Sequence, residues 1–451
     1  MFIVRLAKRR PVSSGKLRIP RFKSTYLERA VAPNLAEQML NNVERNNEAL
    51  MGTPLSVIGD PALNNGVEWM ADIGEKPQMS YDEMVTLANI GDPFGLVEKD
   101  ISALAGGIKH LLGSDHPVLE SCAKYFFDQE KGGGKTIRPT MVLAVSYALN
   151  VGRPASRAEL EKSDENDIKS DHSQNSFDSI AAEVGNMGAL TASPRQKRLA
   201  EIVELIHTAS LFHDDVIDKA GTRRGVPSVN QIFGNKLAIL GGDYLLSRAS
   251  VNLARLRNFE VTEIIATVIE HLVKGEILQM KPSGAPTGNS ALLKYMKKNF
   301  YKTASLMGHG CLAAAVLGNH SEKHKRAAYL YGAYLGQAFQ LVDDMLDFED
   351  SSVLTGKAPL ADLQSGLATA PTLFAAEEYP KLTDLITRKF ELPGDVDEAL
   401  AYVKQSKGLE RSRELAQLHA EKAIDAIQML EPSPARDALV SLACRVVMRK
   451  N

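Results

Sequence analysis

Several features are scarce in this sequence, and each absence excludes a class of protein. Only three cysteines occur among 451 residues, so neither a disulfide framework nor a zinc site is indicated. The formal net charge of −2 gives no reason to expect nucleic-acid binding. The longest stretch without an acidic or basic residue, 303–321, contains three glycines and two histidines. It is better interpreted as a buried helix than as a membrane span.

Acidic residues are absent from the first 27 positions. Eight basic residues, interleaved with hydroxyl and apolar residues, precede the first acidic residue, Glu28. This composition is typical of a mitochondrial transit peptide, and the continuous apolar core of a secretory signal is missing. Residues 1–27 are therefore predicted to be a transit peptide, with a basic disordered tail as the alternative.

No run alternates apolar and polar residues for long enough to predict a strand, so the fold class is predicted to be all-α. Residues 28–91 contain four prolines and no sustained periodicity, and are predicted to be a loosely structured lead-in. Residues 92–451 are predicted to form one large helical domain. Within it, residues 156–192 are rich in Ser, Asp and Asn and are predicted to be a disordered insertion. Ser193 and Pro194 are predicted to begin a long helix, and Pro139 another.

One acidic pentad occurs twice, and each copy ends an apolar helical stretch. The copies are Asp-Asp-Val-Ile-Asp at 214–218 and Asp-Asp-Met-Leu-Asp at 343–347. Positions i and i+4 lie on one face of a helix, so the first and last aspartates of each copy stack. Carboxylates this close repel one another unless a cation lies between them, and hard ions such as Mg2+ suit these oxygen ligands. One copy alone would be an ordinary solvated helix end, but two copies favour a metal site.

Two basic segments suggest phosphate binding. Lys135 and Arg138 lie beside a run of glycines, which would let the backbone approach an anion, although the P-loop spacing is not met. Arg223 and Arg224 follow the first pentad at once. Arginine grips phosphate with two parallel hydrogen bonds, and these arginines also fit simple neutralisation of the aspartates.

Ordered motifs follow one another from about residue 92 to 451, apart from the insertion. Among them are GGKTIRP (133–139), IHTASLFHDDVID (206–218), TRRG (222–225), GEILQ (275–279), KTASL (302–306) and FQLVDDMLDF (339–348). With these motifs the sequence resembles the all-trans polyprenyl diphosphate synthases, specifically the mitochondrial type that makes the ubiquinone side chain.

The resemblance implies a single helical bundle around a deep central cavity, and it implies roles for particular residues. Up to three Mg2+ ions would be held by Asp214, Asp215, Asp218, Asp343, Asp344 and Asp347. The allylic diphosphate would contact Arg223, Lys302, Thr303, Gln340 and Lys357. Isopentenyl diphosphate would contact Lys135, Arg138, His207 and Arg224. Lys302 and the aspartates other than Asp347 would be the catalytic group.

Chain length is expected to depend on the residues that precede the first pentad on its helix. Val203, Ile206 and Ser210 recur towards Asp214 with helical spacing, and Ala209 lies beside them. Short-chain members of the family typically place an aromatic residue at positions 209 and 210, whereas this chain has small ones. The growing product is therefore expected to pass deeper.

The resemblance implies a prenyltransferase that adds isopentenyl units to a farnesyl or geranylgeranyl diphosphate primer. A homodimer or a hetero-oligomer with a related subunit is expected, in the mitochondrial matrix, with peripheral contact with the inner membrane as a further expectation. A non-catalytic partner subunit is the alternative, although such a subunit is expected to lack part of the acidic or basic motifs. A terpene cyclase would also use Asp-rich metal sites, but the residues implied for isopentenyl diphosphate favour elongation. A purely structural metal-binding protein leaves both basic motifs unexplained.

Overall fold

The structure is a computed structural model that describes residues 75–112, 121, 125, 136–152, 191–223, 226–280, 287–348 and 360–449. The chain divides into two compact units, Met1–Asn65 and Gly66–Asn451, and all described residues belong to the second. The described residues do not include the predicted transit peptide, most of the lead-in or nearly all of the predicted insertion. Lys135, Arg224 and Lys357 also lie outside the described residues.

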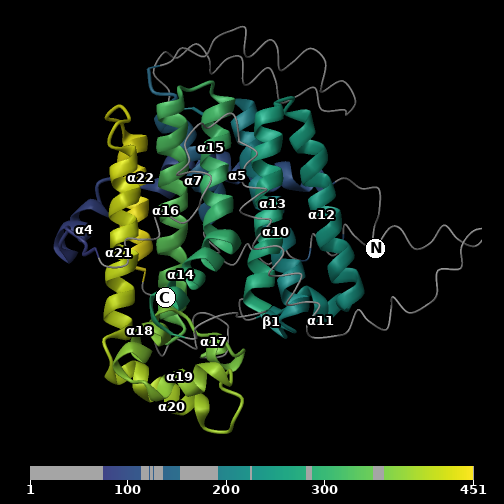
Figure 1. The fold of residues 1–451 in the computed structure, drawn as a ribbon. Helices are drawn as coiled ribbons and strands as arrows, with labels where there is room; N and C mark the ends of the chain where they lie inside the picture. Colours follow the sequence, from purple (N-terminus) through teal and green to yellow (C-terminus); the bar gives the residue numbers. More distant parts are fainter. Residues whose placement is uncertain are drawn as a thin grey trace, which may run out of the picture. The chain divides into compact units, whose positions relative to one another are not determined.

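The described part of the second unit is helical apart from one short antiparallel ribbon, which confirms the predicted all-α class (Figure 1). In its first half the elements are α4 (Tyr81–Leu87), α5 (Pro93–Leu112), α7 (Ile137–Leu149), α10 (Pro194–Ile217), β1 (Thr222–Arg223), β2 (Val226–Pro227), α11 (Val229–Phe233), α12 (Asn235–Arg255) and α13 (Phe259–Met280). In its second half they are α14 (Gly288–Asn299), the π-helical turn η3 (Phe300–Ala304), α15 (Ser305–Leu317), α16 (Glu322–Leu346), α17 (Ala361–Gln364), α18 (Ala370–Glu378), α19 (Lys381–Thr387), α20 (Asp395–Gln405), α21 (Gly408–Ile427) and α22 (Pro434–Val447).

The centre of the bundle is α15, which packs against α7, α10, α13 and α16 (Figure 1). Every residue from Ser305 to Val316 is buried. A helix that is apolar all round belongs in a core, so the buried helix predicted within 303–321 is confirmed. Among the described helices, none combines the length and apolar character that crossing a bilayer requires. The two neighbours α10 and α16 carry the acidic pentads at their C-terminal ends.

Helix starts follow local capping chemistry. Ser193 and Gln196 form a capping box at the start of α10 with Pro194 in its first turn, as the sequence predicts. Helix α7 begins at Ile137, two residues before the predicted start at Pro139. A proline is tolerated in the first turn, because the backbone N–H that it lacks would have no partner within the helix there. Helix α4 lies within the segment predicted to be loosely structured. It also begins with a capping box, in which Ser80 is the N-cap residue.

The segment from residue 75 to 92, here called the strap, packs against the two C-terminal helices. The Glu421 carboxylate on α21 accepts hydrogen bonds from the backbone amides of residues 78 and 79, both at 2.8 Å. The Arg445 guanidinium on α22 donates to the carbonyls of Ala88 at 2.9 Å and Gly91 at 3.1 Å. A Cβ atom at Gly91 would lie 2.8 Å from the backbone nitrogen of Ala438, so the strap contacts α22 backbone to backbone. The strap therefore fixes the position of α22, whose last turn leads to Arg449.

Helices α17 to α20 form a second apolar cluster that begins just after the second pentad. Phe348 packs in this cluster with Leu363, Leu382 and Phe390. The Asp347 carboxylate accepts hydrogen bonds from the amides of residues 361 and 362, at 3.1 and 3.0 Å. The end of α16 is thereby tied to the start of this cluster.

Candidate active site

The first pentad faces the lysine of the π-helical turn. Asp214 is half-buried on the last turn of α10, and burial raises the pKa of its carboxyl to about 6, although the Lys302 charge opposes this rise. Burial would lower the pKa of Lys302, but the Asp214 and Glu276 carboxylates raise it above its usual value. The Lys302 ammonium donates to Glu276 Oε2 at 2.5 Å and to Gln279 Oε1 at 3.2 Å. A fixed cation therefore lies beside Asp214.

Close backbone approach is needed for this arrangement. A Cβ atom at Gly275 would lie 2.7 Å from Lys302 Cγ and 3.1 Å from its backbone nitrogen. Only glycine at position 275 lets α13 approach η3 so closely. The GEILQ motif thus brings both hydrogen-bond acceptors of Lys302 to the site, Glu276 and Gln279.

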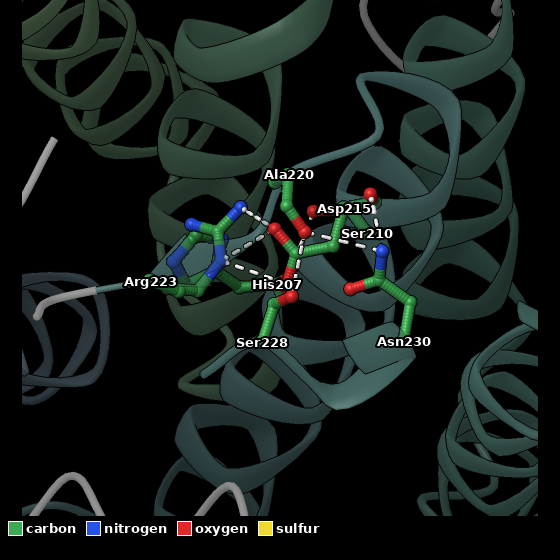
Figure 2. Close-up of polar contacts among 7 residues, drawn as sticks. All are labelled: His207, Ser210, Asp215, Ala220, Arg223, Ser228 and Asn230. Carbon is green, nitrogen blue, oxygen red and sulfur yellow. Dashed lines mark hydrogen bonds and ion pairs between the residues drawn. The ribbon is translucent and has the colours of Figure 1, made fainter. Parts of the chain in front are cut away.

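Asp215, the next residue along the first pentad, forms a buried ion pair with Arg223. Its carboxylate is 1% exposed and accepts hydrogen bonds from Arg223 Nε at 2.9 and 3.1 Å and from Nη2 at 2.6 Å. Figure 2 shows the guanidinium facing this carboxylate, with Asn230 and Ser228 directed at the carbonyl of Ala220. The Asn230 amide also donates to the Asp215 carbonyl at 3.1 Å. These bonds fix the chain between the first pentad and α11.

Hydrogen-bond donors from other parts of the fold hold the carboxylates of the second pentad. Arg449 pairs with Asp343, which is half-buried. Asp344 is 4% exposed, and it accepts hydrogen bonds from the Tyr295 hydroxyl at 2.6 Å and from the Gln340 amide at 2.7 Å. Burial raises the pKa of the Asp344 carboxyl. Both oxygens of Asp344, like both of Asp347, are therefore engaged by protein donors.

The π-helical turn η3 lies between the two pentads. Lys302 faces Asp214 of the first, and the Thr303 hydroxyl donates to Gln340 Oε1 at 2.7 Å. Gln340 in turn donates to Asp344 of the second. Isolated π-helical turns are frequent at functional sites, because the wider turn redirects side chains. This turn brings Lys302 and Thr303 to one site.

A second group of cationic side chains lies beside Phe339, and it shares Arg449 with the second pentad. Arg138 Nη1 lies 2.9 Å from His207 Nε2, and because arginine cannot accept, His207 accepts here and carries its ring proton on Nδ1. The guanidinium carbons of Arg138 and Arg449 lie 6.0 and 4.9 Å from the Phe339 ring centre. Two residues predicted to bind isopentenyl diphosphate, Arg138 and His207, thus contact each other across α7 and α10.

The donor set fits a hard divalent cation shared with a ligand. Among the described residues, no three His, Cys, Asp or Glu side chains form a ready-made metal cluster. Arginine, tyrosine and amide donors instead hold the carboxylates Asp215, Asp343, Asp344 and Asp347 individually. Carboxylate oxygens with phosphate as a further ligand are the usual Mg2+ environment, whereas these side chains alone are not a closed cage.

The residues expected to set chain length are buried on α10. Val203 and Ala209 are 0% exposed and Ile206 is 1% exposed. The Ser210 hydroxyl is half-buried and donates to the His207 carbonyl at 2.8 Å (Figure 2). A Cβ atom at Gly310 would lie 3.4 Å from Val203, so α15 packs closely on this part of α10.

Sequence reasoning missed four residues of this site: Glu276, Tyr295, Phe339 and Arg449. Glu276 lies in the motif GEILQ and Phe339 in the motif FQLVDDMLDF, so their place in these motifs was the available signal. Tyr295 lies seven positions before Lys302, two helical turns away, and Arg449 is near the end of the chain. No local pattern singles out either of these two.

Comparison with known proteins identifies the family. A sequence model described as "Polyprenyl synthetase" matches residues 116–403. This chain belongs to the polyprenyl synthetase family. It is 43% identical over 434 residues to a probable mitochondrial hexaprenyl pyrophosphate synthase of Neurospora crassa, covering 94% of this chain and 93% of that protein. It is 41% identical over 358 residues to a human all trans-polyprenyl-diphosphate synthase, covering 79% and 77% of the two chains.

Solved structures of polyprenyl synthetases share the fold. A polyprenyl synthase from Caulobacter crescentus, solved with calcium and isoprenyl diphosphate, has a TM-score of 0.65 at 27% identity, over 84% of this chain and 99% of that one. An Arabidopsis medium/long-chain prenyl pyrophosphate synthase without ligand has a TM-score of 0.59 at 36% identity, over 79% and 99%. The resemblance, the enzyme class of prenyltransferase and the mitochondrial location are confirmed. The strap and α22 lie outside the matched range 116–403.

Proposed function

We propose that this polyprenyl synthetase condenses isopentenyl diphosphate units onto a farnesyl or geranylgeranyl diphosphate primer. The product would be a long all-trans polyprenyl diphosphate for the ubiquinone side chain. The observation that carries the proposal is the place of η3, because Lys302 faces the first pentad while Thr303 is bonded to the second through Gln340. Diphosphate held there would meet positive charge and both sets of carboxylates.

The reaction would begin by ionising the primer. Lys302, Thr303, Gln340 and Arg223, together with Lys357, would grip its diphosphate and stabilise the negative charge that builds as the C–O bond breaks. When bound, up to three Mg2+ ions would neutralise further charge on the same leaving group. The isopentenyl double bond would then attack the allylic cation, and a proton would pass to the released diphosphate. Buried apolar side chains would exclude water from the cation.

The six aspartates would have two different roles. Asp214, Asp218 and Asp343 would hold Mg2+, and Asp343 would exchange its Arg449 partner for metal. Asp215, Asp344 and Asp347 would be ligands only if their present donors moved. In their present positions they would orient the other three. The Caulobacter relative, solved with a divalent ion and isoprenyl diphosphate, supports such a site in this family.

The second substrate would bind at the Phe339 cationic group. Arg138 and His207, with Lys135 and Arg224, would grip isopentenyl diphosphate, and Arg449 adds a further cation beside Phe339. Separate cationic sites for two diphosphates favour elongation over cyclisation, which needs only one. The growing chain would extend past Ala209 and Ser210 towards Ile206 and Val203.

Assembly with a second copy or a related subunit would cover an exposed apolar surface. Large apolar side chains are exposed on the neighbouring helices α12 and α13: Ile239, Leu240, Val251, Val273, Ile277 and Met280. Contiguous exposed apolar surface commonly marks an interface. We further propose that residues 1–27 are removed on import.

The test is elongation by the purified chain alone. It is incubated with farnesyl diphosphate, labelled isopentenyl diphosphate and Mg2+, and the products are sized chromatographically. The proposal predicts long polyprenyl products, and Lys302→Ala should abolish them. Absence of elongation until a related subunit is added would support the alternative, an obligate partner subunit.

A further inference from the structure

Tyr295 lies outside the sequence motifs that carry the family resemblance, yet its hydroxyl reaches the second pentad. The side chain is 5% exposed, and α14, from which it comes, packs against η3. Its hydroxyl donates to Asp344 Oδ2 at 2.6 Å, within the 2.5–2.7 Å of bonds from hydroxyls to carboxylates. A buried tyrosine needs such a partner, but many acceptors would satisfy it. This one binds the residue directly after Asp343.

Tyr295 belongs to a continuous hydrogen-bonded chain. Gln340 donates to the other oxygen of Asp344 at 2.7 Å, and Thr303 donates to Gln340 at 2.7 Å. The amide of Gln340 is thus fixed at both ends, and the Asp344 carboxylate is fixed on both oxygens. Three elements, α14, η3 and α16, are joined at the point where the second pentad meets the turn that carries Lys302.

A positive charge lies behind this chain. The Lys298 ammonium, one turn after Tyr295, lies 5.2 Å from the centre of the tyrosine ring. The lysine charge therefore lies against the face of the ring whose hydroxyl binds Asp344.

We propose that Tyr295 is a positioning residue for the metal site: its hydroxyl holds Asp344 in the orientation that presents Asp343 to Mg2+. This inference rests on the proposed function. Hydrogen-bond partners of the ligands and of their supports orient a metal site, and their removal typically weakens metal binding by about 10–100-fold. Tyr295→Phe removes one oxygen and keeps the ring, so it isolates the hydroxyl.

The chain offers a matched control. Tyr331, on α16, is also fully buried, and its hydroxyl donates to the carbonyl of Leu439 at 2.8 Å, away from both pentads. Tyr331→Phe therefore deletes a buried hydroxyl and one hydrogen bond without touching the site. Comparable losses of melting temperature are expected in both variants.

The experiment titrates Mn2+ into the intact protein in the presence of farnesyl thiolodiphosphate, a poorly reactive primer analogue, and measures free Mn2+ by electron paramagnetic resonance. Tyr295→Phe should bind Mn2+ at least about tenfold more weakly than the wild type, and Tyr331→Phe should match the wild type. Elongation by Tyr295→Phe should need more Mg2+ but should approach the wild-type kcat at saturation. Unchanged or tighter Mn2+ binding in Tyr295→Phe, or equal weakening in both variants, would overturn the inference. A wild type that binds Mn2+ but elongates no primer would instead overturn the proposed function.

Discussion

Replacing Arg223 by leucine should destabilise the fold strongly, because it leaves the Asp215 carboxylate buried without its partner. Asp215 is 1% exposed and Arg223 is 25% exposed, so solvent replaces little of the lost interaction. Removing one member of a buried pair costs about 3–5 kcal/mol. An unfolding entropy of about 2.1 cal/mol/K per residue amounts to about 0.8 kcal/mol per kelvin over Gly66–Asn451. The melting temperature should therefore fall by about 4–6 °C.

The assay is differential scanning calorimetry of four proteins without metal or substrate: wild type, Arg223→Leu, Asp215→Asn and the double variant. The double variant should be more stable than Arg223→Leu alone, because no unpaired charge remains. Arg223→Lys should fall between wild type and leucine, since lysine keeps the charge and loses the bidentate geometry. A melting temperature of Arg223→Leu within about 1 °C of the wild type, or additive losses in the double variant, would refute the reasoning.

Three further predictions concern chain length, the strap and pH. Ala209→Tyr should shorten the product, because it places an aromatic ring at a fully buried position before the first pentad. The products are sized chromatographically. An unchanged length distribution would contradict the proposal that the growing chain extends past Ala209. Gly91→Ala should destabilise the fold by about 1–3 kcal/mol, because the new Cβ atom would press against the backbone of Ala438. The control is Gly106→Ala in the exposed middle of α5, where a new Cβ atom meets nothing within 4 Å. In the same thermal melts this control should stabilise the fold by about 0.5–1 kcal/mol. Burial lowers the pKa of His309 to about 4, so the unfolded chain takes up a proton at this residue first as pH falls from 6.5. The stability that neutral His309 contributes should therefore be complete above that pH and be lost towards pH 4. The difference in melting temperature between the wild type and His309→Gln should shrink as pH falls from 6.5 to 4, and a constant difference would contradict this reasoning.

Much of the fold could be predicted because its signals are local. Ser193, Pro194 and Gln196 specify the start of α10 within four residues, and the structure begins the helix there. The buried helix within 303–321 was evident from its lack of charge, since a helix without a polar face must lie in a core. Helix α4 was not predicted, because seven residues are too few to display a helical period.

Less of the site could be predicted, because its contacts join distant parts of the chain. The pentads, Lys302 and Arg138 were found by residue type and motif, and the structure places Lys302 beside Asp214. Neutralisation of the first pentad by Arg223 was among the alternatives open from sequence, but Asp215 was not singled out as its partner. Nothing in the sequence indicated that Arg449 reaches Asp343, more than a hundred residues away. Such pairings depend on how α10, α16 and α22 pack, which no local pattern encodes.

We propose that both acidic pentads serve one metal–diphosphate site. The most direct test of this proposal is anomalous diffraction from crystals grown with Mn2+ and farnesyl thiolodiphosphate. Manganese is expected on Asp214 and Asp218 and on Asp343, bridged by one diphosphate that also contacts Lys302. Manganese confined to one pentad, or diphosphate bound away from Lys302, would contradict it.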